Sequence, residues 1–261
     1  MSVGTLAPGS KAPAANYWRD SSRPLVSLAF VAPLLALYEG GVTIIGCNAI
    51  RSGADAWLRR CLELAGFGQY FLLPLLTCAL LLAWHHARHE PWRIDGGVIA
   101  RMWIEAAAWG GGLIFMARTG LLLGADGLLG NSAAAIVEAP SRDVTARLIG
   151  YIGAGIYEEL LFRLILLTAA FGVLRGARLS RTSSLMSAIL LTSLLFAAAH
   201  YRWDATWLGL PLEWTGGEPF LPLGFAFRLA GGIFLATLFA YRGIGIAVGA
   251  HAAYDLFVLL G

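Results

Sequence analysis

Residues 157–163 read Tyr-Glu-Glu-Leu-Leu-Phe-Arg and lie inside an otherwise apolar segment that runs from about Val144 to Gly172. The whole chain is 58% hydrophobic and only 13% charged over 261 residues, which is too apolar for a soluble domain of this size. We therefore expect the segment to lie in a bilayer, where each ionisable group costs about 2.5–3.5 kcal/mol on insertion scales. Two glutamates and an arginine at this depth predict a functional site.

The apolar segments decide the fold class. A membrane-spanning helix needs about 20 residues, and seven stretches of this chain qualify. They are residues 25–46, 69–87, 98–123, 146–172, 184–203, 223–241 and 243–260. Barrel strands would be shorter and would alternate in polarity, so we predict an all-α fold, a polytopic transmembrane helix bundle of seven or eight spans. Residues 55–64 combine apolar and charged side chains and are expected to form an amphipathic interfacial helix in addition.

The distribution of arginines predicts the orientation. Arginines gather in the N-terminal segment and in the loops after the second and fourth spans, whereas the loops near 124–145 and 204–222 are mainly acidic. The positive-inside rule then places the N-terminus in the cytoplasm. Arg51, Arg59 and Arg60 oppose this assignment, because they would lie on the outer side; we attribute them to the interfacial helix.

Helical spacing separates the charges of the opening stretch. Glu159 and Arg163 are four residues apart, so they share one face of a helix and are expected to pair. Glu158 lies about 100° round the helix from Glu159 and is left without a cation. A carboxylate of this kind suits a general base at neutral pH. The alternative is that all three side chains form a structural ion-pair network between helices.

Two histidines favour the functional interpretation. His200 closes the sequence Phe196-Ala-Ala-Ala-His200 near the end of the fifth predicted span, and His251 lies inside the seventh with Asp255 one turn further on. Alanines beside both histidines permit close approach of neighbouring helices. If these groups converge with Glu158, they form either a water-activating set or a metal site.

The three motifs together resemble the CPBP family of intramembrane proteases. Glu-Glu-x-x-x-Arg, Phe-x-x-x-His and His-x-x-x-Asn/Asp occur there in this order on successive membrane helices, in the type II CAAX-processing endopeptidases and the bacterial Abi proteins. The matching residues here are Glu158, Glu159, Arg163, Phe196, His200, His251 and Asp255. The resemblance covers about residues 145–260 and includes Tyr241-Arg242-Gly243 before the last motif.

The resemblance implies a glutamate-dependent peptidase and a role for each residue. Glu158, assisted by His200, would activate a water for attack on a peptide carbonyl. His251 and its partner four residues on would stabilise the oxyanion, and stabilisation of this kind is typically worth about 2.7–4 kcal/mol. Glu159 and Arg163 would be a structural ion pair, in agreement with their spacing.

Asp255 departs from the strictest family pattern, in which the CAAX-processing enzymes have Asn. An ionised aspartate only accepts hydrogen bonds and would repel an oxyanion. Either Asp255 is protonated, or it orients His251 by holding one ring nitrogen, and we favour the second reading. The substitution also leaves a zinc site open as an alternative, with Glu158, His200, His251 and Asp255 as ligands. Our main prediction is that no cofactor is needed.

The predicted organisation has three parts. Residues 1–24 are expected to be a flexible cytoplasmic tail, residues 25–143 to hold the N-terminal transmembrane helices with the interfacial helix, and residues 144–261 to form a CPBP-like catalytic core. We expect a multi-pass protein of the bacterial plasma (inner) membrane that contacts lipids and a membrane-anchored or exported protein substrate, in the manner of exosortase-like members, and no nucleic acid. The rival functions are a non-catalytic immunity or scaffold protein and a proton-coupled transporter.

Three further charges lie in apolar segments outside this core. Glu39 and Arg118 fall within the first and third predicted spans, and Glu105 lies nearer to one end of the third span than Arg118 does. We predict that Glu39 and Arg118 pair across helices as a structural strut. A role for either in contacting substrate is the alternative.

Overall fold

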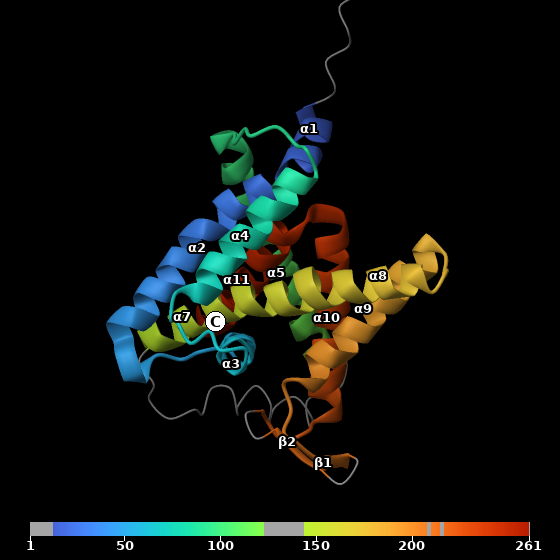
Figure 1. The fold of residues 1–261 in the computed structure, drawn as a ribbon. Coiled ribbons are helices and arrows are strands. Elements are labelled where there is room, and N and C mark those ends of the chain that lie inside the picture. Colours follow the sequence, from blue (N-terminus) through green and yellow to red (C-terminus); the bar gives the residue numbers. More distant parts are fainter. Residues whose placement is uncertain (1–12, 123–143, 208–209, 215–216, 261) are drawn as a thin grey trace, which may run out of the picture.

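The computed structural model describes residues 13–122, 144–207, 210–214 and 217–260 (Figure 1). Its helices are α1 (Pro13–Ser21), α2 (Pro24–Ile45), η1 (Gly46–Asn48), α3 (Gly53–Leu64), α4 (Leu72–Ala87), α5 (Gly96–Leu122), α7 (Val144–Glu159), η2 (Leu160–Leu167), α8 (Thr168–Gly176), α9 (Arg181–Ala198), α10 (Pro222–Arg242) and α11 (Ile244–Leu260). Two short strands, β1 (Trp203–Trp207) and β2 (Leu210–Trp214), form an antiparallel hairpin between α9 and α10. The predicted helical fold is confirmed, and the hairpin is an addition to it in a segment expected to be a loop.

Length and composition identify the helices that could cross a membrane. In the described part of the chain four are long and apolar enough: Pro24–Asn48, Gly96–Thr119, Arg181–Ala198 and Pro222–Arg242. Leu72–Ala87 and Ile244–Leu260 are shorter apolar helices. The segment that carries the two glutamates continues from α7 through η2 into α8 without a break. The number of seven or eight spans stays a prediction.

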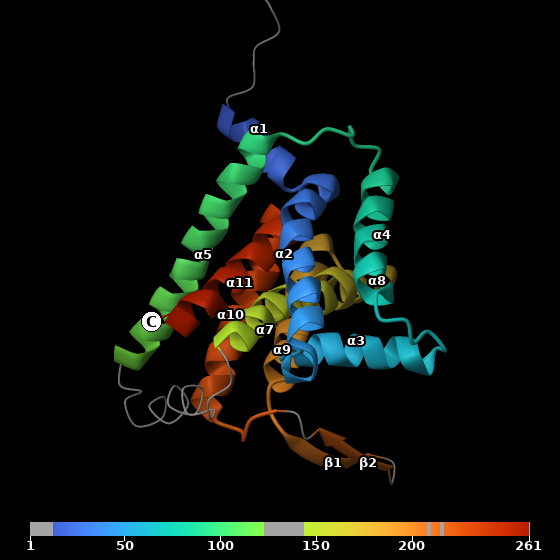
Figure 2. The same ribbon diagram turned by 90° about the vertical axis from the view of Figure 1, so that its left-hand side faces the viewer.

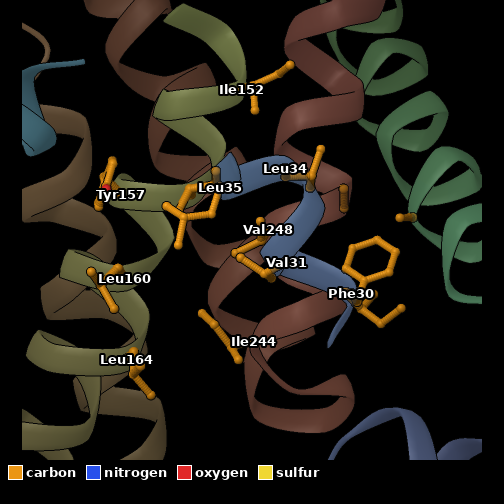
Figure 3. Packing of buried hydrophobic residues seen from close by; sticks show 14 of the residues in the cluster. Phe30, Val31, Leu34, Leu35, Ile152, Tyr157, Leu160, Leu164, Ile244 and Val248 are labelled. Atoms are coloured by element: carbon orange, nitrogen blue, oxygen red, sulfur yellow. The ribbon is translucent and has the colours of Figure 1, made fainter. Parts of the chain in front are cut away.

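The core lies where α2, α7, η2 and α11 meet, and Figure 3 shows their buried side chains facing one another. Small residues let these helices approach closely. A Cβ atom added at Gly155 of α7 would lie 2.8 Å from the backbone nitrogen of Ala252 in α11, so no larger side chain fits without a shift. This contact brings His251, the neighbour of Ala252, against the helix that carries Glu158. The alanines beside His251 thus have the packing role expected of them.

The N-terminal segment is not a tail throughout, which corrects the expectation for residues 1–24. Residues 13–21 form α1, which lies beside the start of α5 (Figure 2). Arg242 is 1% exposed, lies 2.6 Å from Glu105 and stacks on the ring of Trp18 in α1. Glu105 is therefore a structural partner of Arg242. Residues 1–12 and most of the acidic loop 124–145 lie outside the described residues.

The predicted strut between Glu39 and Arg118 is wrong. Glu39 lies 2.8 Å from Arg59 of α3 and accepts a hydrogen bond from Tyr157 of α7, whereas Arg118 is exposed. The pairing follows from the position of α3, which lies at the end of the bundle opposite α1 (Figures 1 and 2). No spacing in the sequence indicates where a short interfacial helix docks.

Candidate active site

The predicted ion pair of Glu159 and Arg163 forms inside the protein. Arg163 Nε lies 3.1 Å from Glu159 Oε2, and their side chains are 1% and 0% exposed. The guanidinium also stacks over the ring of Phe196 at 4.3 Å, which gives this motif residue a contact of its own. The pair therefore links η2 to α9 at the centre of the bundle.

A π-helix follows directly after the two glutamates, over Leu160–Leu167. Such segments are rare, and they frequently lie at functional sites. The periodicity of apolar residues does not reveal it, because every position from Leu160 to Leu167 except Arg163 is apolar. The π-helix begins directly after Glu159, which is the last residue of α7. Glu158 and Glu159 lie on different faces of α7.

Two histidines converge on one oxygen of Glu158. Nε2 of His200 lies 3.7 Å from Glu158 Oε2, and Nε2 of His251 lies 3.9 Å from the same atom. The three residues come from α7, from the end of α9 and from α11. These distances exceed hydrogen-bond reach, so no direct hydrogen bond joins either imidazole to this oxygen. The structure thus brings together the residues that the motifs single out.

The orientation of His251 differs from the expectation. Its Nδ1 lies 2.8 Å from Glu159 Oε1, at hydrogen-bond distance, whereas Asp255 Oδ2 lies 3.7 Å from its Nε2. The orienting contact that we assigned to Asp255 therefore belongs to Glu159. Glu159 has two neighbours, Arg163 on one oxygen and His251 on the other, because α11 packs directly on α7 through Gly155.

The ring of His200 is held by the last turn of α9. Its Nδ1 lies 2.7 Å from the carbonyl oxygen of Phe196, and because a carbonyl only accepts, this nitrogen carries the proton. The other nitrogen, Nε2, then faces Glu158 with a free lone pair. This tautomer allows His200 to accept a proton at the site.

The backbone of His200 is fixed by residues that the sequence reasoning missed. The N–H of Glu218, after the hairpin, donates to the carbonyl of His200, and the Glu218 side chain lies 2.8 Å from Arg228 of α10. Arg228 also donates to the hydroxyl of Tyr201 at 2.7 Å. Glu218 and Arg228 are ten residues apart in the sequence, and this spacing does not predict that they form an ion pair.

Glu158 and His200 line a pocket with a volume of about 540 Å³. This volume lies in the range of about 300–1,000 Å³ that is typical of ligand sites. Apart from Glu158, His200 and Glu218 the walls are apolar or glycine, with Leu161, Phe162, Leu166, Leu195, Ala198, Ala199, Gly53, Ala54, Trp57 and Gly217 as the remaining lining residues. Three of these residues belong to α3. The pocket suits an apolar group brought next to a carboxylate and an imidazole.

Within the part of the chain that the structure describes, no group of three or more His, Cys, Asp and Glu side chains has an arrangement that could hold a metal ion. One ring nitrogen of His251 and one of His200 are engaged with Glu159 and with the Phe196 carbonyl, and the other nitrogen of each ring faces Glu158. Histidines that bind a metal often have their second ring nitrogen engaged in this way. The zinc site of Glu158, His200, His251 and Asp255 therefore stays an alternative prediction.

Comparison with protein families agrees with this geometry. Residues 140–257 match the family model of the Rce1-like type II CAAX prenyl endopeptidases. Over this segment the chain is similar to the Rce1-like family. The Rce1-like match spans every motif residue from Glu158 to Asp255 and leaves α1 to α5 outside it. Comparison with curated proteins gives no match, and comparison with solved structures gives none.

Proposed function

We propose that this protein is an intramembrane endopeptidase in which Glu158 activates a water for hydrolysis of a peptide bond. The observation that carries the proposal is the convergence of His200 and His251 on one oxygen of Glu158, at the wall of an apolar pocket. A carboxylate in an apolar bundle costs free energy unless it has a functional or structural role, and the Glu158 side chain is only 12% exposed. The family match to a group of endopeptidases supports the same conclusion.

The proton transfers follow from the positions of Glu158 and His200. Oε2 of Glu158 has no hydrogen-bond partner within the described structure, so it is free to accept the proton of a water as the oxygen attacks the carbonyl. His200, with its free Nε2 toward the same point, orients this water and shares the proton. Protonated Glu158 then returns the proton to the leaving amine, which completes the hydrolysis.

Charge balance assigns the roles of His251 and Asp255. Three carboxylates lie within 4 Å of the His251 ring, at 2.8, 3.7 and 3.9 Å, which favours the positive imidazolium. The imidazolium donates from Nδ1 to Glu159 and from Nε2 to the oxyanion. Glu158 and Glu159 then balance Arg163 and His251, so a protonated Asp255 leaves the cluster neutral. A protonated carboxyl is also a donor, as the Asn of the family pattern would be.

The surroundings of the site indicate the class of substrate. The pocket is walled mainly by apolar side chains within a membrane protein, so the substrate is a membrane-anchored or exported protein that presents apolar residues beside the scissile bond. Lipids surround the bundle, and the reaction needs neither a cofactor nor nucleic acid. A cytoplasmic N-terminus and the bacterial plasma membrane stay predictions from the distribution of arginines.

The first test compares protein termini in cells. Membrane proteins would be analysed by mass spectrometry in cells that carry the wild-type chain, Glu158→Gln or Glu63→Gln at equal abundance. Glu63 is a suitable control because its side chain is 53% exposed and, among the described residues, forms an ion pair with the surface residue Arg60 alone. We expect one or a few proteins to keep a terminal segment in Glu158→Gln cells alone. If no terminus changes while a phenotype follows Glu158, the carboxylate serves transport or assembly and the peptidase proposal fails.

Metal independence is tested on isolated membranes. Cleavage of the substrate found in this way should be unchanged after treatment with EDTA or 1,10-phenanthroline, because water activation rests on the Glu158 carboxylate. Loss of cleavage on chelation, with recovery on addition of zinc, would instead establish the zinc site of Glu158, His200, His251 and Asp255. A matched membrane sample without chelator controls for loss of activity over time.

A further inference from the structure

We propose that α3, which lies outside the segment matched to the Rce1-like family, forms a specificity-determining wall of the active-site pocket, and that Trp57 limits the size of the apolar side chain beside the scissile bond. Gly53, Ala54 and Trp57 of α3 line the same pocket as Glu158 and His200. This inference rests on the proposed peptidase function and adds the feature that selects among substrates.

The side chains on this face of α3 differ greatly in size. Trp57 lies four residues after Gly53 and three after Ala54, so its side chain is on the same side of the helix as each of them. The two small residues leave space, and Trp57 is the only large side chain that α3 contributes to the pocket lining. Trp57 is 46% exposed, so its indole is not fixed within the core and borders open space. Its replacement by a smaller residue therefore enlarges the pocket on the α3 side.

A buried ionic network holds α3 in place. Asp55 is 0% exposed and accepts hydrogen bonds from Tyr38 of α2 (2.8 Å), Arg51 (2.7 Å) and Arg59 (2.7 Å). Burial by itself lowers the pKa of Arg59, but the charges of Asp55 and Glu39 outweigh this, and the net pKa is raised. The arginine therefore keeps its charge, and α3 is fixed to α2.

The same network reaches the residue next to the proposed base. Arg59 lies 2.8 Å from Glu39 Oε1, and the Tyr157 hydroxyl donates to the same oxygen at 2.5 Å. Tyr157 directly precedes Glu158 in α7. Glu39 thus binds both α3, through Arg59, and α7, through Tyr157. We expect this shared contact to fix the distance between Trp57 and the carbonyl that Glu158 acts on. A wall fixed in this way discriminates by size, whereas a loosely bound surface helix would yield to a large side chain.

The simpler alternative is that Trp57 only anchors α3 at the lipid headgroups, as indoles commonly do. Leu64 provides a matched control for this alternative. It is an apolar residue of the same helix, is 75% exposed and does not line the pocket. A loss of anchoring should follow from either substitution, but a change in selectivity should follow only from substitution of Trp57.

The test uses the full-length chain in proteoliposomes of phosphatidylcholine and phosphatidylglycerol. The probe is a library of synthetic membrane-spanning peptides in which the residues near one end are varied among Ala, Leu, Phe and Trp, with products identified by mass spectrometry. Trp57→Ala should raise the cleavage rate of peptides with Phe or Trp beside the cut, relative to those with Ala, by about tenfold or more, because a single methylene in an apolar pocket already changes selectivity by ~10–200-fold. Leu64→Ala should leave the ratio unchanged.

The outcomes separate this inference from the proposed function. An unchanged ratio in Trp57→Ala, or an equal fall for all peptides, overturns the role of Trp57 while the peptidase stands. If Trp57→Ala does not fold, Trp57→Phe takes its place and should shift the ratio in the same direction by a smaller factor; no shift overturns the inference. If the wild type and Glu158→Gln both cleave nothing, the peptidase function fails and the Trp57 inference with it.

Discussion

Loss of Glu158 and His200 together is expected to slow peptide cleavage no more than loss of Glu158 alone. The two side chains lie 3.7 Å apart, next to the position proposed for the attacking water. We therefore expect both groups to act on the same proton of the water, so that removal of either one also removes the catalytic contribution of the other. Residues that act as a unit in catalysis show strongly non-additive losses.

The experiment measures cleavage by purified Glu158→Gln, His200→Ala and the double variant under single-turnover conditions. General acid–base catalysis typically contributes about 10²–10⁴-fold, so each single variant should lose a factor in this range. The double variant should lie within a few-fold of Glu158→Gln. Losses that multiply would show that Glu158 and His200 act independently and would contradict the shared-water geometry. Glu63→Gln serves as the matched control and should cleave at the wild-type rate.

Replacement of Arg163 by methionine is expected to cost about 3–5 kcal/mol of stability, because it leaves one partner of a buried ion pair uncompensated. Glu159 is 0% exposed and would retain only His251 as a neighbour of opposite charge. The Phe196 ring would also lose the guanidinium stacked on it. This is the largest effect on stability that we expect from a single substitution in the site.

A double variant separates the uncompensated charge from the lost packing. Glu159→Leu combined with Arg163→Met removes both charges, and such replacements of a buried pair are often close to neutral. We therefore expect the double variant to be more stable than Arg163→Met alone in equilibrium unfolding in mixed micelles. Arg60→Met is the control, since this arginine is 69% exposed in a surface pair worth about 0–1 kcal/mol. A double variant less stable than Arg163→Met would contradict the explanation.

Local spacing predicted much of the site. Glu159 and Arg163 pair because residues four apart on a helix share a face, and Glu158 points elsewhere for the same reason. The small residues near His251 correctly indicated close helix packing, which occurs at Gly155 and Ala252. These inferences succeed because they depend only on the geometry of one helix or on side-chain volume.

The partners from different helices were not predictable. Glu39 was assigned to Arg118 and pairs with Arg59, and His251 was assigned to Asp255 and is held by Glu159. In both cases the rotation and crossing of two helices decide which polar groups meet. The hydropathy of a segment gives its apolar character, but it predicts neither the rotation of a helix about its axis nor the angle at which it crosses its neighbour.

The sequence by itself determined the helical fold class, the polar residues that an apolar bundle must accommodate, and the similarity of residues 140–257 to the Rce1-like family. Tertiary structure alone decided that α1 packs against α5, that α3 supplies a wall of the pocket, and that Glu218 fixes the backbone of His200. The physical reason is that the free energy of inserting a segment depends on its own residues, whereas the position of a short helix depends on contacts with distant parts of the chain.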